Sequence, residues 1–330
     1  HLRDEYAISV TGTIRPRGEG LANPNLATGE IELVADELTI LNASQPLPIS
    51  LNESNKSSED LRLKYRYLDL RRPKMQETLK QRAKYLSFIR RFMEDQDFLE
   101  VQTPILANSS PEGARDFLIP SRIHSGKFYA LPQAPQQFKQ LLMVGGIDKY
   151  YQIAPCFRDE DPRADRLYGD FYQLDLERAF VEDGEEIRTE MEVLIQNLVK
   201  DFAGKTLVSE EIPRISYEDA MNIYGSDKPD LRFGMTLVDL DETLATTDFA
   251  VFKNAKKVKA ICVKGAASLS RSQIDAFTEI AKKEGAGGLA YLTYVDGGIK
   301  SPIAKFLTEA ELAEITAKTG AEDGDIVFFG

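Results

Sequence analysis

The spacing of hydrophobic and polar residues predicts a β-rich start to the chain. Tyr6, Ile8 and Val10 alternate with small or polar residues, and the same period of two returns after residues 16–29. That intervening segment is rich in Gly, Pro and Asn, which is typical of a loop between strands. Because two strands alone are only marginally stable in water, we expect residues 1–49 to be the later part of a small β-barrel.

Helical periodicity dominates the middle of the chain. Apolar residues recur every three or four positions over 76–96 and over 185–202, which predicts two amphipathic helices. A short helix is expected at 135–144, with Pro135 in its first turn. Strands are expected at 98–101, 149–158 and 171–178.

The last hundred or so residues have the pattern of an independent α+β unit. Ser270 with Gln273, and Thr308 with Glu311, have the spacing of capping boxes that open helices. Gly285 and Gly320 are expected to end these helices, and strands are expected at 258–263, at 289–295 and at the end of the chain. The predicted organisation is a barrel segment at 1–49, a linker or hinge at 50–75, a catalytic α+β domain at 76–230 and an inserted α+β domain at 231–330.

The charge balance limits the classes of partner. The 330 residues carry a formal net charge of −12, which argues against a protein that coats nucleic acid or anionic membranes by bulk charge. A local basic patch can still recognise one nucleic acid. The stretch at 62–74 is the best candidate, either as a solvated face or as a contact for phosphate.

Other features of the composition exclude several kinds of site. The two cysteines, Cys156 and Cys262, cannot form a disulfide framework, and two histidines exclude multi-histidine metal sites. No apolar run approaches the ~20 residues of a membrane span, so we expect a cytoplasmic protein without membrane contact. The chain begins and stops at strand-like segments, which suggests a fragment of a longer protein.

The densest group of polar residues follows the strand that ends near Arg158. If the strand continues, Arg158 and Glu160 share one face. On the neighbouring strand, one face carries Phe171, Gln173, Asp175 and Glu177. An arginine can pair with a phosphate, an aromatic ring can lie against a purine, and a carboxylate can hold an ammonium group. The alternative is a sheet surface covered by salt bridges.

Two further segments carry suitable chemistry. Gln136 and Lys139 are three residues apart on the predicted short helix, so both point the same way and suit a small carboxylated ligand. The alternative is an ordinary surface helix. The charged, glycine-containing segment 111–117 is either a loop that covers a site or an ordinary loop.

These residues, in this order, resemble the class II aminoacyl-tRNA synthetases, and most closely the bacterial-type aspartyl-tRNA synthetases. Residues 98–104 resemble class II motif 1, and residues 157–175 resemble motif 2. Residues 111–117 and 136–143 are similar to the aspartate-binding segments of that family. Residues 1–49 resemble part of its OB-fold anticodon-binding barrel, and residues 231–330 resemble its amidotransferase-like insertion domain. The resemblance covers nearly the whole chain.

The resemblance implies that ATP activates aspartate, which is then transferred to tRNA. Arg158 would be the catalytic residue at the α-phosphate. It would also help to hold aspartate, with Lys139 on the side-chain carboxylate and Asp175 on the ammonium group. The other implied ATP contacts are Asp159, Glu160 and Phe171; the other implied aspartate contacts are Glu112, Gln136 and Gln173. A buried lysine would reject neutral asparagine, because an unpaired buried charge is costly.

The resemblance also implies a metal and partners, and the sequence differs from the family pattern at several positions. It implies Mg²⁺ with ligands outside this chain, a homodimer with Pro104 in its interface, and a tRNA for aspartate or also for asparagine. Motif 3 has no counterpart in these residues. Leu167 stands where a glutamine normally contacts ATP, Ala134 replaces a capping serine, and Asp97 replaces a glycine.

Three alternative functions stay open. One is a related class II synthetase that uses asparagine or lysine. Another is a catalytically inactive synthetase-like fragment or tRNA-binding module, which the missing motif 3 favours. The third is an amidotransferase subunit, which only residues 231–330 suggest and which leaves the motif 2 pattern unexplained.

Overall fold

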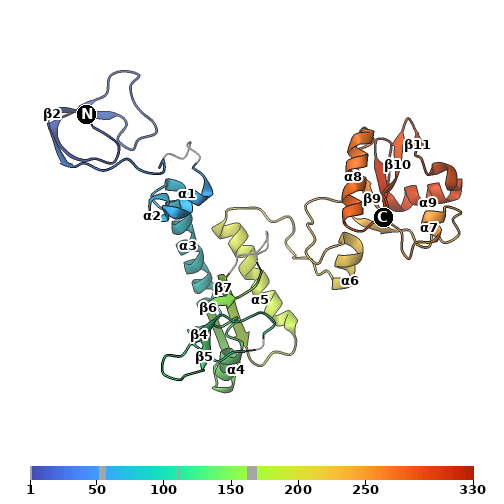
Figure 1. The fold of residues 1–330 in the computed structure, drawn as a ribbon, viewed down its shortest axis with the longest axis horizontal. Helices are drawn as coiled ribbons and strands as arrows, with labels where there is room; N and C mark the ends of the chain where they lie inside the picture. Colours follow the sequence, from blue (N-terminus) through green and yellow to red (C-terminus); the bar gives the residue numbers. More distant parts are fainter. Residues whose placement is uncertain (1, 52–56, 111, 162–168) are drawn as a thin grey trace. The chain divides into compact units, whose positions relative to one another are not determined.

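The chain forms two compact units. A computed structural model describes residues 2–51, 57–110, 112–161 and 169–330, and it divides the chain into His1–Glu210 and Glu211–Gly330 (Figure 1). Residues before 231 contact the second unit: Lys259 Nζ donates to the carbonyl of Asn222 at 2.8 Å. The predicted domain division at residue 231 stays a prediction. Within the described residues, no helix is both long and apolar enough to cross a membrane.

The first unit starts with an antiparallel pair of strands, β1 (Ala7–Pro16) and β2 (Ile31–Asn42). The strands close so tightly at Gly12 that an added Cβ would lie 2.0 Å from the carbonyl oxygen of Val34. The two predicted strands are confirmed, and the described residues pair them only with each other. The complete barrel stays a prediction.

The predicted linker contains two short helices, α1 (Glu59–Lys64) and α2 (Arg66–Asp69). The fully buried Asp69 side chain organises them: its carboxylate accepts hydrogen bonds from Arg62 at 2.9 Å and Arg66 at 2.7 Å. Arg72 also lies 3.5 Å from the same carboxylate. Much of the predicted basic stretch therefore neutralises an internal aspartate. The sequence had suggested either a solvated face or a contact for phosphate, and this third role was not expected.

A three-stranded sheet and two long helices form the centre of the remaining first unit, together with the strand pair β4–β5 and the short helix α4. The sheet has the order β3–β6–β7, with β3 parallel to β6 and β6 antiparallel to β7. Ile89 and Met93 pack with Tyr151 and Leu194 in its core, so the helices predicted at 76–96 and 185–202 are confirmed. The elements are α3 (Pro73–Asp95), β3 (Leu99–Glu100), β4 (Leu118–Pro120), β5 (Phe128–Ala130), α4 (Gln136–Val144), β6 (Lys149–Arg158), β7 (Gly169–Arg178), α5 (Gly184–Asn197) and the π-helical turn η1 (Leu198–Phe202).

The second unit is built on a five-stranded antiparallel sheet of order β11–β10–β12–β9–β8. All four residues of its strand β12 are buried: Ile326 and Phe328 pack in one core cluster, Val327 and Phe329 in the other. Both predicted capping boxes are present. The elements are α6 (Tyr217–Asp219), η2 (Ala220–Tyr224), β8 (Leu237–Asp239), α7 (Ala250–Lys253), β9 (Lys259–Val263), α8 (Arg271–Lys283), β10 (Ala290–Val295), β11 (Gly298–Lys300), η3 (Ala304–Phe306), α9 (Glu309–Thr319) and β12 (Ile326–Phe329).

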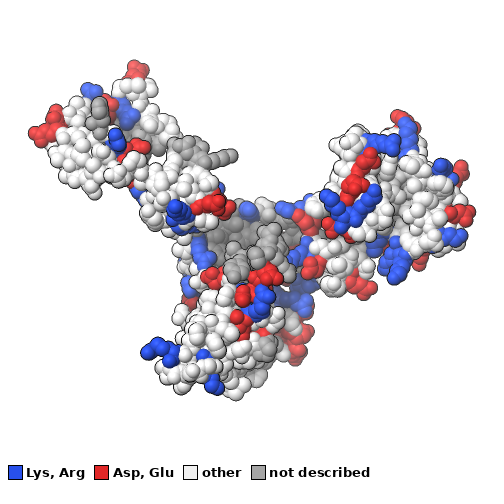
Figure 2. Space-filling model, viewed as in Figure 1, with Lys and Arg blue, Asp and Glu red and all other residues white. Residues whose placement is uncertain are grey.

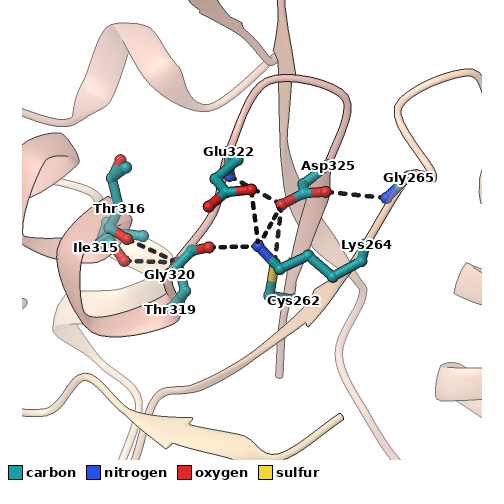
Figure 3. A network of polar contacts seen from close by, with 9 residues as sticks. All are labelled: Cys262, Lys264, Gly265, Ile315, Thr316, Thr319, Gly320, Glu322 and Asp325. Atoms are coloured by element: carbon teal, nitrogen blue, oxygen red, sulfur yellow. Dashed lines mark hydrogen bonds and ion pairs between the residues drawn. The ribbon is translucent and has the colours of Figure 1, made fainter. Parts of the chain in front are cut away.

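The buried carboxylate of Asp325 and the ammonium group of Lys264 connect the segment that follows α9 to the segment that follows β9 (Figure 3). Asp325 accepts hydrogen bonds from the backbone of Gly265 at 2.9 Å and Glu322 at 2.8 Å, and from Lys264 Nζ at 2.9 Å. The same ammonium group donates to the carbonyl of Gly320 at 2.6 Å. Burial by itself raises the pKa of the Asp325 carboxyl. The hydrogen bonds from these donors lower it by a larger amount, so the pKa lies below its usual range.

Candidate functional site

The hairpin β6–β7 carries most of the predicted site residues. Its register places Cys156 opposite Phe171 and Gln152 opposite Asp175, so one face holds Arg158 together with the predicted residues of β7. The Arg158 guanidinium carbon lies 5.0 Å from the centre of the Phe171 ring. Glu160 differs from the expectation: β6 ends at Arg158, so strand alternation does not orient the Glu160 side chain.

A buried cation lies beside this face. Helix α4 brings Lys139, which is 9% exposed, to within 2.9 Å of Asp175 Oδ1 and 3.3 Å of Glu177 Oε2. Burial by itself lowers the pKa of the Lys139 amine. The hydrogen bonds and negative charges of the two carboxylates raise it by more, so the pKa lies above its usual value and the group stays charged. The two residues that the family pattern assigns to opposite charges of a substrate thus neutralise each other.

The floor of the site contains buried polar atoms without partners. Among the described residues, neither the hydroxyl of the fully buried Tyr150 nor Asp175 Oδ2 has a hydrogen-bond partner. Burial and the nearby Asp175 charge both raise the pKa of the Tyr150 hydroxyl. Asp175 thus acts directly on the Tyr150 hydroxyl, so the two groups lie close together at the floor of the site.

The remaining predicted residues of α4 and the hairpin are more loosely held. Gln136 is the first residue of α4 and is exposed, and the helix has no side-chain cap at Pro135. Gln173 Oε1 accepts a hydrogen bond from Cys156 Sγ at 3.2 Å. Burial raises the pKa of the Cys156 thiol to about 11, so this cysteine is protonated at neutral pH and is a poor nucleophile.

The charged loop lies against the end of β6. Arg115 and Asp159 are joined twice: the Asp159 backbone N–H donates to the Arg115 carbonyl, and Arg115 Nε donates to the Asp159 carbonyl, both at 3.0 Å. Glu112 lines a cavity of about 150 Å³ with Asp116 and Gln133. The structure therefore brings the loop next to Arg158, the residue before Asp159.

Two residues contact this site without having been predicted as ligand contacts. Glu177, which the sequence pattern placed on this face of β7, is the second carboxylate on Lys139. Gln133 is 3% exposed and binds the charged loop, but an isolated glutamine between prolines gives no such signal.

Pro104, the predicted interface residue, follows β3 and is exposed. The buried Gln152 fixes its neighbourhood, because Gln152 Oε1 accepts a hydrogen bond from the Thr103 N–H at 2.7 Å. Leu99 and Leu106, on either side in the sequence, are each 54% exposed. Pro111 and residues 162–168, which include Leu167 and most of the motif 2 loop, lie outside the described residues.

Charges of both signs are interspersed on the face of the molecule in Figure 2. This face therefore has no large area of a single sign of charge. Within the described ranges, no group of three His, Cys, Asp or Glu side chains is arranged to hold a metal ion.

Comparisons with known proteins agree on one family. Residues 58–312 match the tRNA synthetases class II (D, K and N). The chain is 49% identical to an aspartate–tRNA(Asp/Asn) ligase of Pelodictyon phaeoclathratiforme, with 100% of this chain and 55% of the relative covered. It is 52% identical to the aspartate–tRNA(Asp/Asn) ligase of Bacillus cytotoxicus, with 99% and 56% covered. The chain thus spans about half the length of the curated relatives that it matches.

Solved structures of this group share the fold. An asparaginyl-tRNA synthetase of Entamoeba histolytica in complex with asparaginyl-adenylate has a TM-score of 0.53 at 15% identity, with 99% of this chain and 78% of that chain covered. A putative aspartyl-tRNA synthetase of Leishmania major has a TM-score of 0.51 at 16% identity, with 98% and 75% covered. At these identities the likeness concerns the fold alone.

Proposed function

This chain belongs to the class II tRNA synthetases of the D, K and N group, and from that premise we propose that it is the aspartate-activating part of an aspartate–tRNA ligase. The observation that carries the proposal is Lys139, a buried and charged lysine that contacts Asp175 on the same hairpin face as Arg158. The names of the relatives, which are ligases of aspartate, support the same choice.

The proposed reaction has two steps. The aspartate α-carboxylate attacks the α-phosphate of ATP, and pyrophosphate leaves. The ribose hydroxyl at the tRNA 3′ end then attacks the aspartyl-adenylate and releases AMP. No covalent enzyme intermediate is needed, so positioning and charge stabilisation provide the rate enhancement.

We assign the nucleotide to the outer end of the hairpin. Arg158 contacts the α-phosphate and stabilises the charge that develops there, because a guanidinium pairs well with phosphate oxygens. Phe171 presents its ring to adenine, and Asp159 and Glu160 complete the ATP contacts. The Mg²⁺ ligands stay assigned outside this chain.

The charged groups of the amino acid replace an ion pair of the free site. The side-chain carboxylate of the substrate pairs with Lys139 in place of Asp175, and its ammonium group pairs with Asp175. Glu112, Gln136 and Gln173 complete the aspartate contacts. Asparagine would leave the Lys139 charge without an anionic ligand, which disfavours it.

The proposal extends to the partners and to the other domains. We propose that a second copy packs against the exposed motif 1 segment around Pro104 and that the tRNA of aspartate, or also that of asparagine, is the acceptor. The OB-fold barrel at 1–49 and the amidotransferase-like insertion at 231–330 belong to the same proposal. The cytoplasmic location stays a prediction.

ATP–pyrophosphate exchange by the full-length gene product tests this function, with aspartate, asparagine and lysine in parallel. We expect exchange with aspartate alone, and its loss in Arg158→Ala. Arg122→Ala, in the exposed segment between β4 and β5, is the matched control and should exchange normally. Exchange with asparagine or lysine alone would assign a related synthetase. No exchange with any of the three would favour the inactive or tRNA-binding alternative.

A further inference from the structure

Gln133 makes an unusual set of contacts in the segment between β5 and α4. Its buried side chain accepts from the Ala114 N–H at 3.1 Å and donates to the Ala114 carbonyl at 2.9 Å. The same amide nitrogen also donates to the carboxylate of Asp116. One side chain therefore satisfies both backbone groups of a loop residue, for which an amide is suited by its separate donor and acceptor.

The backbone of the same segment continues toward the phosphate side of the site. The Gln133 carbonyl accepts from Arg158 Nε at 3.4 Å, and the Pro132 carbonyl accepts from the Phe157 N–H at 2.9 Å. The Leu131 N–H donates to the Phe117 carbonyl at 3.0 Å. Residues 131–133 thus lie between the charged loop and the end of β6, with hydrogen bonds to both.

We propose that Gln133 is a positioning residue that holds the loop carrying Glu112 in register with Arg158. One residue then connects both sides of the site: its side-chain amide binds the loop on the amino-acid side, and its backbone carbonyl accepts from Arg158 on the phosphate side. This inference rests on the proposed function for its kinetic consequences. The inference also has a geometric consequence: the hydrogen bonds of Gln133 hold the loop at 112–117 in place. This consequence does not depend on that function.

Gln133→Glu tests the proposal with an almost unchanged side-chain volume. The introduced carboxylate still accepts from the Ala114 N–H, but it cannot donate, and it faces the carboxylate of Asp116. We expect kcat/KM for aspartate in pyrophosphate exchange to fall about 100-fold at pH ~8. Burial and the neighbouring carboxylate raise the pKa of the introduced group, so activity should recover toward pH ~6, where a proton restores the donor.

A second substitution separates positioning from general damage. In Gln133→Glu combined with Asp116→Asn, the new amide at 116 can donate to the introduced carboxylate, and we expect about tenfold of the loss to be regained. Gln273→Glu is the matched control. The side-chain oxygen of that glutamine accepts the capping-box hydrogen bonds from Ser270, and a carboxylate accepts them equally well. The exchange of amide for carboxylate should therefore leave kcat/KM and its pH profile unchanged.

Limited trypsin cleavage after Arg115 supplies a measurement that needs no enzymatic activity. If Gln133 fastens the loop, Gln133→Glu should be cleaved there severalfold faster than the wild type, and adding Asp116→Asn should slow the cleavage again. Wild-type kcat/KM at both pH values with wild-type cleavage would overturn the proposal. Faster cleavage in a protein that exchanges with no amino acid would support the positioning role while the proposed function fails.

Discussion

The ammonium group of Lys139 lies between two carboxylates of one strand face, with Asp175 at 2.9 Å and Glu177 at 3.3 Å. Because lysine is rarely buried without partners, this arrangement holds a positive charge ready in the free protein. An anionic side chain that replaces Asp175 keeps two counter-charges on the lysine. A neutral ligand of the same size leaves it with Glu177 alone.

Lys139→Met should therefore remove aspartate use more than nucleotide use. We expect kcat/KM for aspartate to fall about 100-fold or more, with KM for ATP changed about twofold at most. Pyrophosphate exchange at varied aspartate and varied ATP measures both. Lys127→Met, at an exposed position before β5, is the control and should behave as the wild type. An equal loss for both substrates would contradict a role confined to the amino acid.

At the residue scale, the sequence predicted what depends on local geometry. The period of two in β7 was enough to group Phe171, Gln173 and Asp175 on one face, because strand alternation is set within the strand itself. It could not show that Lys139 pairs with Asp175, 36 residues away, since that contact depends on how α4 packs. Glu160 lies two residues beyond the end of β6, so the strand alternation on which its predicted face depended does not reach it.

At the element scale, the turn after α3 shows how a departure from the family pattern is accommodated. Asp97 has a φ of 62°, in the left-handed region where glycine is usual. The N–H of Phe98 donates to the Met93 carbonyl, and the N–H of Asp97 donates to the Glu94 carbonyl, which together form a Schellman motif. The backbone therefore keeps the conformation of a glycine at a position occupied by aspartate.

Asp97→Gly should stabilise the first unit. Relief of the left-handed strain outweighs the extra chain entropy of glycine, and we expect a gain of about 0.5 kcal/mol in the free energy of unfolding. Thermal or urea unfolding of the 330-residue chain measures it. Asp95→Gly, two residues earlier at the end of the helix, should instead cost about 0.5–1 kcal/mol. A loss of stability in both variants would mean that the aspartate side chain stabilises the turn.

The Asp69 cluster predicts a specific acid sensitivity. Hydrogen bonding from Arg62 is the main reason that the pKa of the Asp69 carboxyl lies below its ordinary value of 3.8. A carboxyl with a lowered pKa stabilises the fold above the unfolded-state pKa, and this contribution is lost as the pH falls through the folded-state pKa. The first unit should therefore lose stability below pH ~4.

Asp69→Asn should remove that contribution at every pH. We expect a loss of about 3 kcal/mol at neutral pH, because three arginines lose a buried counter-charge, and a flatter dependence on pH in the acid range. Urea unfolding between pH ~3 and ~7 measures both effects. Asp60→Asn, at an exposed position of α1, should change neither by more than about 0.5 kcal/mol. An unchanged acid slope in Asp69→Asn would contradict the assignment.

Long periodic helices and capping boxes were predictable because their signals lie within a few residues. The capping boxes at Ser270 and Thr308 form as the spacing predicts. The three-residue strands β4, β5, β8 and β11 were not predicted, since their pairing depends on distant neighbours rather than on their own pattern. The second compact unit starts at Glu211, and η2 contacts it through Lys259, whose partner lies 37 residues away in the sequence.

At the scale of the whole molecule, each core cluster draws on one unit only. The cluster around Met93 uses residues of 88–198, and the two clusters around Leu292 and Phe328 use residues of 238–329. Cooperative unfolding follows shared cores, so two units with separate cores should unfold in two transitions.

Crossed core substitutions test this independence. Met93→Ala and Leu292→Ala each empty a fully buried site, and each should cost about 2–5 kcal/mol. We expect Met93→Ala to lower only the transition of the first unit and Leu292→Ala only that of the second, as measured by calorimetry of the 330-residue chain. A probe in the second unit, Tyr294, should follow the second transition in both variants. If either substitution lowers both transitions equally, the two cores unfold as one cooperative unit. A substitution in residues 211–330 would then change activity at the site simply by changing the stability of the whole chain.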